Sequence, residues 1–315
     1  MLTAGSVPLV APIVGPIGAA VAQTHVQNQA ARPTKQQAPS IAAENRTRLV
    51  EFENAPFPFD SGNDPRRRKA AASTESERYS DPRVLMHIPK GFDIRKPGLL
   101  VIFFHGHRAT IKRDVLDRQR VADQISLSRA NAVLVAPQFA VNASDSSAGN
   151  FWTPGLFTMF LNEASEQFAI LHGDLGMARD FDKLNVLIVG YSGGYAPVAW
   201  AIHHGGSNER LRGVVLLDAL YGEVDKFEKW IMGDRFRRFF VSGYLGSTRA
   251  RNLQLQQSLG NRNVRYRMAL DERIRPGSIT FLAGKDGERH NDYVTRAWAA
   301  NPLSDLLNRL PEYQR

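Results

Sequence analysis

The sequence predicts an α/β protein in which a mostly parallel, doubly wound sheet carries helices on both faces. Three observations lead to this fold class. From Arg83 onward short apolar runs alternate with helix-like segments, several of those runs are apolar throughout, and one of them leads into a Gly-x-Ser-x-Gly turn at Gly190–Gly194. Strands that alternate with helices form parallel sheets, and strands buried on both faces lack polar alternation.

The individual elements follow from the periodicity of the apolar residues. Strands are expected over residues 84–88, 99–104, 132–136, 186–189, 213–217, 238–241 and 279–283. Helical spacing predicts helices over residues 113–128, 157–171, 195–204, 250–259 and 292–299. Residues 1–43 are expected to form a disordered apolar leader and flexible linker, and residues 44–82 an irregular N-terminal arm, which leaves residues 83–315 as the globular domain.

Composition narrows the classes of function. The 315-residue chain is 43% hydrophobic, has no cysteine and carries a net charge of +9. It therefore supports a large core and excludes disulfides, thiolate metal sites and a cysteine nucleophile. The charge favours polyanions in general, but no nucleic-acid-binding motif is visible, so no specific nucleic-acid partner is expected. The oligomeric state stays open, and no apolar run is long enough for a transmembrane segment.

The N-terminal residues bear on localisation. Residues 7–22 are apolar and small, and they end in Ala20-Val21-Ala22, which resembles a signal-peptidase site. No lysine or arginine precedes Arg32, so the usual basic start of an export signal is missing. Two interpretations remain: a weak export signal, with a periplasmic or secreted protein, or a disordered apolar tail on a cytoplasmic protein.

Ser192 is the candidate nucleophile. It stands in Gly190–Gly194, between the expected strand 186–189 and the expected helix 195–204. A serine on so tight a turn adopts a strained backbone, and small neighbours let the strand and the helix approach each other. The turn lifts the serine hydroxyl out of the sheet, and the Gly193 amide then points at a developing oxyanion.

The partners of Ser192 are expected where other strands end, because sites in parallel sheets lie past the carboxyl ends of the strands. Asp218 follows strand 213–217, and His290 lies in a polar loop after the last strand. The order Ser192, Asp218, His290 is nucleophile, acid, base. No carboxylate follows the next strand, at 242–247, which makes Asp218 the preferred acid, with alternatives among the remaining carboxylates Glu223, Asp225 and Asp286.

His105-Gly106-His107 ends another strand and has two interpretations. In the first, the chain turns at the glycine so that a backbone amide near His107 or Arg108 completes an oxyanion hole with Gly193. In the second, the histidines form a metal pair, which lacks a third ligand nearby, so no metal is expected. No dinucleotide fingerprint follows the first strand, and no cofactor is expected. The candidate substrate contacts are Tyr191, Trp152 and Tyr221.

From Arg83 to His290 the chain resembles the α/β-hydrolase superfamily of esterases and lipases. The turn from Pro89 to Asp93, the strand ending in His105-Gly106, and the Gly190–Gly194 elbow carry the resemblance. It implies that Asp218 follows the arrangement of pancreatic-type lipases and that His290 occupies the position of the family's base. The expected function is a serine hydrolase that cleaves an ester, or secondarily an amide, of a small molecule or polymer through an acyl-enzyme. The alternative is a non-catalytic binding or scaffolding protein on the same fold, with a basic surface for anionic polymers.

Overall fold

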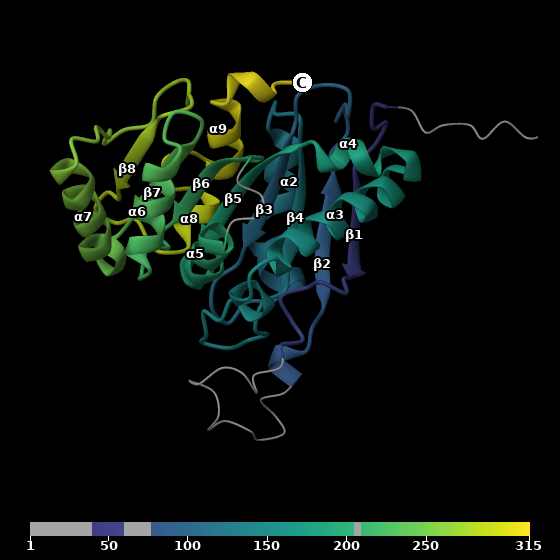
Figure 1. The fold of residues 1–315 in the computed structure, drawn as a ribbon, viewed down its shortest axis with the longest axis horizontal. Coiled ribbons are helices and arrows are strands. Elements are labelled where there is room, and N and C mark those ends of the chain that lie inside the picture. The colour runs from purple at the N-terminus through teal and green to yellow at the C-terminus, as the bar shows by residue number, and fades with distance from the viewer. Residues whose placement is uncertain (1–39, 60–76, 205–208) are drawn as a thin grey trace, which may run out of the picture. The chain divides into compact units, whose positions relative to one another are not determined.

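One eight-stranded sheet organises the described residues 40–59, 77–204 and 209–315 in a computed structural model (Figure 1). Its strand order is β1-β2-β4-β3-β5-β6-β7-β8, with β1 and β2 antiparallel to their neighbours and all other pairs parallel. The strands are β1 (Arg46–Glu51), β2 (Arg83–Ile88), β3 (Leu99–Phe104), β4 (Ala132–Pro137), β5 (Asn185–Tyr191), β6 (Leu211–Leu217), β7 (Phe239–Tyr244) and β8 (Ile279–Ala283). The mostly parallel, doubly wound sheet that the sequence predicts is confirmed.

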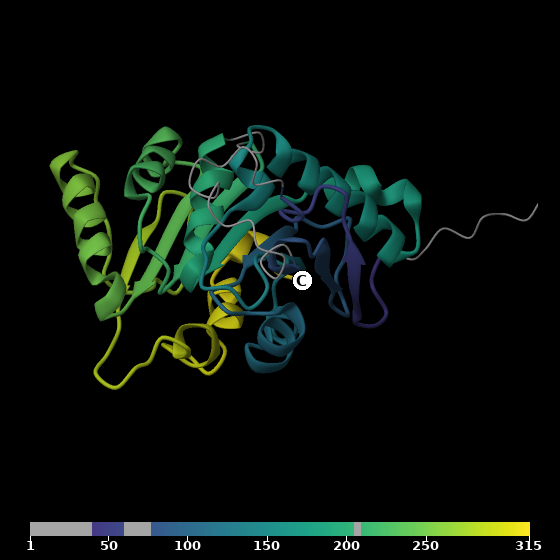
Figure 2. The same ribbon diagram turned by 90° about the horizontal axis from the view of Figure 1, so that it is seen from below.

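Both faces of the sheet are covered by helices (Figure 2). Along β3, Leu100, Ile102 and Phe104 pack on one face, while Leu99, Val101 and Phe103 pack on the other. The first face meets α3 (Leu156–His172), α4 (Ala178–Asp182), α5 (Tyr195–His204), α6 (Val224–Gly233) and α7 (Gly246–Asn261). The second meets the π-helix η3 (Ile111–Arg118), α2 (Val121–Leu127), α8 (Asp292–Thr295) and α9 (Pro302–Asn308). This double burial explains why the central strands are apolar at every position.

The sequence predicts an irregular arm over residues 44–82. The structure instead has a strand, β1, within this range, and β1 pairs with β2. β1 is an edge strand whose side chains are mostly half-buried or exposed, and its sequence is Arg-Thr-Arg-Leu-Val-Glu. A charged edge strand lacks the apolar run that is typical of a buried strand, so the sequence pattern did not predict β1.

Two helix expectations also need correction. The helix expected over residues 113–128 is two elements, η3 and α2, which Arg120 separates with a left-handed backbone (φ 51°). The helix expected over 292–299 ends at Thr295, and a second helix, α9, begins at Pro302, where proline suits the first turn. Helices α4 and α6 were not predicted from the sequence. Helices α3 and α5 lie where they were expected.

The short 3-10 turns are η2 (Glu77–Tyr79), η4 (Gly149–Trp152), η5 (Leu175–Met177), η6 (Ser192–Gly194) and η7 (Pro311–Tyr313). Parallel strands β3, β5, β6, β7 and β8 run in the same direction, so their carboxyl ends share one edge of the sheet. The segments that follow β5, β6 and β8 contain Ser192, Asp218 and His290. The topology therefore brings the three predicted residues to one edge.

Candidate active site

Ser192, His290 and Asp218 form one hydrogen-bonded chain. His290 Nε2 lies 2.7 Å from Ser192 Oγ, and His290 Nδ1 lies 2.6 Å from Asp218 Oδ2. Because an ionised carboxylate only accepts, Nδ1 carries the proton and donates to Asp218, which leaves Nε2 as the acceptor for the serine hydroxyl. The arrangement has the geometry in which an imidazole removes a proton from a serine.

The Ser192 turn has the strain that the motif predicts. Ser192 has φ 55°, in the left-handed region that a non-glycine residue seldom occupies. A side chain on either flanking glycine would collide with its surroundings: a Cβ on Gly190 would lie 2.6 Å from Val198 Cγ2, and one on Gly194 would lie 2.4 Å from the Phe104 carbonyl oxygen. The glycines therefore allow β5, α5 and the end of β3 to close tightly under the serine.

Asp218 directly follows β6 and is fully buried. Besides His290, it accepts hydrogen bonds from the Leu245 amide (2.9 Å) and from the Thr248 hydroxyl. Burial by itself raises the pKa of Asp218, but the hydrogen bonds from His290, Thr248 and Leu245 outweigh it and hold the pKa below the usual range. Asp218 is thus ionised at neutral pH.

The loop after β7 explains the missing carboxylate at residues 242–247. In place of an acid, this segment supplies the Leu245 amide, and the first turn of α7 supplies the Thr248 hydroxyl; both donate to Asp218. Among the alternative acids, Glu223 pairs with Lys226 (2.5 Å) and Asp225 is largely exposed. Only Asp218 is hydrogen-bonded to His290 among the described carboxylates.

Tyr191 does not lie where a substrate contact is expected. Its side chain is buried, its ring stacks on the His290 ring (centroids 4.9 Å apart), and its hydroxyl donates to Asn291 Oδ1 (2.8 Å). Burial raises the pKa of Tyr191 to about 12, so the hydroxyl remains a donor. Tyr191 thus supports the histidine ring from behind, and Asn291 fixes the tyrosine; contact of Tyr191 with substrate stays a prediction.

The other two candidate substrate contacts belong to different segments of the chain. Trp152, at the end of η4, is half-buried and packs edge-on against Phe59 (5.5 Å between centroids). Tyr221 follows β6, is 37% exposed, and its hydroxyl lies 3.2 Å from Ser247 Oγ. Contact of either residue with substrate stays a prediction.

The second oxyanion donor is expected in the segment after β3. The Arg108 amide donates to the Ala143 carbonyl (2.8 Å), so of the two amides considered there, that of His107 is the remaining candidate. The His107 ring packs against Gly193, where an added Cβ would lie 2.2 Å from His107 Cδ2. His107 Nε2 also lies 2.6 Å from Ser146 Oγ, which fixes the segment beside the elbow.

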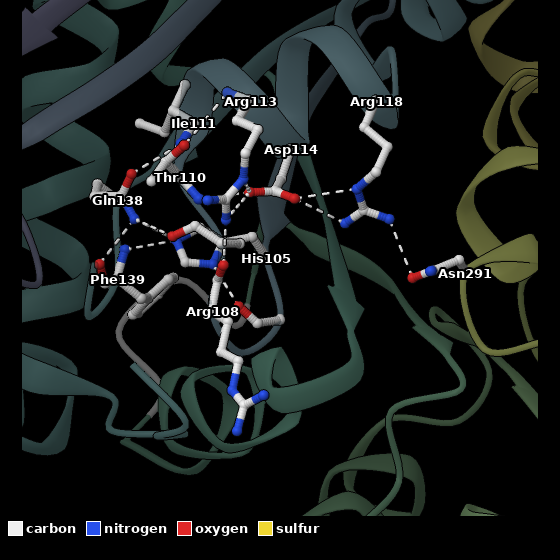
Figure 3. Close-up of polar contacts among 12 residues, drawn as sticks. His105, Arg108, Thr110, Ile111, Arg113, Asp114, Arg118, Gln138, Phe139 and Asn291 are labelled. Atoms are coloured by element: carbon white, nitrogen blue, oxygen red, sulfur yellow. Dashed lines mark hydrogen bonds and ion pairs between the residues drawn. The ribbon is translucent and has the colours of Figure 1, made fainter. Parts of the chain in front are cut away.

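His105 is a buried structural residue. Its Nε2 accepts from the Phe139 amide (2.8 Å) and lies 2.9 Å from Gln138 Nε2, so Nδ1 carries the proton and donates to the Gly106 carbonyl (Figure 3). With both nitrogens engaged, His105 has no lone pair for a metal. No group of three or more potential ligands suits a metal ion within the described residues.

The two buried histidines predict how stability depends on pH. Burial lowers the pKa of both His87 and His105 to about 4. Below pH ~6.5 these histidines become protonated in the unfolded chain, whereas in the folded chain they stay neutral down to about pH 4. The free energy of unfolding therefore decreases as the pH falls from about 6.5 to about 4, by up to on the order of 3 kcal/mol per histidine. Urea unfolding at several pH values measures this dependence. His87→Gln, far from Ser192 in sequence and on β2, is expected to flatten the curve; an unchanged curve would contradict the assignment.

The chain was compared with protein-family models, curated proteins and solved structures. The strand order and the elbow define the α/β-hydrolase fold. No family model and no curated protein matches the chain. Among solved structures, the chain is similar to a feruloyl esterase module from Clostridium thermocellum (13% identity, TM-score 0.48, 90% of this chain and 93% of that chain). It is also similar to an S-formylglutathione hydrolase from Agrobacterium tumefaciens (11% identity, TM-score 0.48, 89% and 100%). At such identities the likeness concerns the fold.

One sequence expectation concerns another part of the chain. The possible export signal at residues 7–22 lies outside the described residues. Within the described ranges, no helix has the length and apolar character needed to cross a membrane.

Proposed function

We propose that the chain is a serine hydrolase that cleaves an ester, or secondarily an amide, through an acyl-enzyme. The single observation that carries this proposal is the continuous hydrogen-bonded chain from Ser192 Oγ through His290 to the buried Asp218 carboxylate. A serine hydroxyl that meets an oriented imidazole becomes a nucleophile at neutral pH. The same chain counts against a non-catalytic binding protein, since binding needs neither the strained serine nor the aligned histidine.

The reaction follows from the positions of the donors and acceptors. His290 Nε2 takes the proton from Ser192 Oγ as the oxygen bonds to the carbonyl carbon, and the amides of Gly193 and His107 are the proposed donors to the resulting oxyanion. Collapse breaks the bond to the alcohol, which leaves with the proton from His290. Water then attacks the acyl-enzyme, with His290 again as the base, and releases the acid and free Ser192. Throughout, Asp218 stabilises the protonated imidazole.

Ester hydrolysis tests this proposal. Purified protein is expected to hydrolyse para-nitrophenyl butyrate with a burst of one product equivalent if deacylation is slow, or steadily if it is not. Ser192→Ala is expected to remove the activity while leaving the circular-dichroism spectrum and unfolding midpoint close to wild type. The control is Ser126→Ala, which removes a serine hydroxyl on α2 that contacts His87 and not the Ser192 site. Activity that survives Ser192→Ala would refute the proposed nucleophile.

A further inference from the structure

Two arginines belong to the segments that contact the proposed triad without taking part in it. Arg118, at the end of η3, donates from Nη1 to Asn291 Oδ1 (3.0 Å), the same oxygen that accepts from the Tyr191 hydroxyl. The Tyr191 ring stacks on His290. Arg118 is therefore linked to the histidine side of the site through two intervening residues.

Arg108 belongs to the segment after β3, which packs against the Ser192 turn. It follows His107, whose ring packs against Gly193, and burial and then the charges of Arg108 and His290 lower the pKa of His107. Arg108 Nε donates to Ser144 Oγ (2.6 Å), which orients the guanidinium. Its terminal nitrogens Nη1 and Nη2 have no hydrogen-bond partner among the described residues. Figure 3 shows the Arg108 guanidinium directed away from the Asp114 carboxylate.

The carboxylates of this rim are engaged elsewhere. Asp114 is shared by Arg113 (2.8 Å) and Arg118 (3.0 Å), and Asp145 accepts from the Ser147 amide (3.1 Å). Arg113 also donates to the Arg108 carbonyl, which fixes the backbone of that residue. A single carboxylate thus serves two of the three arginines, and no described acid pairs with Arg108, so the rim keeps an excess of positive charge.

We propose that the ester cleaved at Ser192 carries an anionic group, a carboxylate or a phosphate, which the Arg108 guanidinium binds. This inference rests on the proposed function, because it concerns the substrate of the same site. A guanidinium held by one nitrogen and open at the other two presents a planar fork that matches two oxygens of a carboxylate or phosphate. Arg118, with its charge partly balanced by Asp114, adds long-range attraction.

Matched pairs of esters test the proposal. One arm compares mono-para-nitrophenyl glutarate with para-nitrophenyl valerate, which places a carboxylate on the acyl part. The other compares the butyrate ester of glycerol phosphate with glycerol monobutyrate, which places a phosphate on the leaving group. Wild type is expected to favour the anionic member of at least one pair, and the favoured arm identifies the anion. The preference is the ratio of the two kcat/KM values.

Variants of Arg108 link that preference to the residue. Arg108→Gln is expected to lower the ratio about tenfold, since an ionic hydrogen bond is lost, and Arg108→Lys to lower it less because the charge remains. Arg179→Gln removes an exposed arginine on α4 and is expected to leave the ratio unchanged. No preference in wild type, or one that survives Arg108→Gln, would overturn the inference while hydrolysis of the neutral esters still upheld the proposed function. Failure to cleave any ester would instead count against the proposed function itself.

Discussion

Replacing His290 with alanine is expected to lower kcat/KM for an ester by on the order of 10⁶-fold, because the serine then has no base and the leaving alcohol no acid. The expectation depends on the contact of 2.7 Å between His290 Nε2 and Ser192 Oγ. The His290 ring stacks on Tyr191, and the side chain is 37% exposed, so its removal opens little of the core. Initial rates with para-nitrophenyl butyrate measure the effect.

The matched control for that variant is His203→Ala. His203 is an exposed histidine at the end of α5, and its ring contacts Trp200 rather than the Ser192 site. It is expected to retain wild-type rates. A His290→Ala protein that folds normally and loses less than about tenfold in rate would assign the proton transfer to another group.

Asp218→Asn is expected to lower kcat by about 10⁴-fold. The asparagine amide would donate to His290 Nδ1, so that the imidazole carries its proton on Nε2 and no longer accepts from Ser192. The variant preserves the volume of a fully buried side chain, but the Leu245 amide and the Thr248 hydroxyl lose an ionic acceptor. A loss of stability therefore accompanies the loss of rate, and rates are to be measured well below the unfolding midpoint.

Asp225→Asn and Glu223→Gln separate Asp218 from the other candidate acids. Asp225 is largely exposed, and Glu223 is bound to Lys226, so both variants are expected to keep activity within about twofold of wild type, as is usual for surface substitutions. If either reduced the rate as strongly as Asp218→Asn, the acid would have been assigned to the wrong carboxylate.

The sequence allowed the central sheet to be predicted because β3, β4, β5 and β6 are apolar on both faces. The edge strand β1 has no such pattern, since it faces solvent and depends on β2 for its hydrogen bonds. The break between η3 and α2 could not be predicted either, because the apolar spacing continues across Arg120. The left-handed backbone of Arg120, which separates the two helices, leaves no mark on that spacing. Local pattern thus predicts the buried elements better than the edges and breaks.

The same distinction holds at the site. Ser192 sits in a contiguous motif, and Asp218 and His290 follow strands, so strand order and topology were enough to place them on one edge. Thr248 and Asn291 were missed because their roles arise only in three dimensions: one donates to Asp218, and the other holds Tyr191 behind His290. A polar residue on a helix, such as Thr248 on α7, carries no sequence signal that separates such a contact from ordinary packing.

The central claim is that Ser192 is an activated nucleophile. A fluorophosphonate probe, which reacts with activated serines and not with ordinary hydroxyls, tests it most directly when the labelled peptide is identified by mass spectrometry. The account predicts one label, on the peptide that contains Ser192, in native wild type, and none in Ser192→Ala or heat-denatured protein. A folded wild-type protein that stays unlabelled, or that is labelled on another serine, would contradict it.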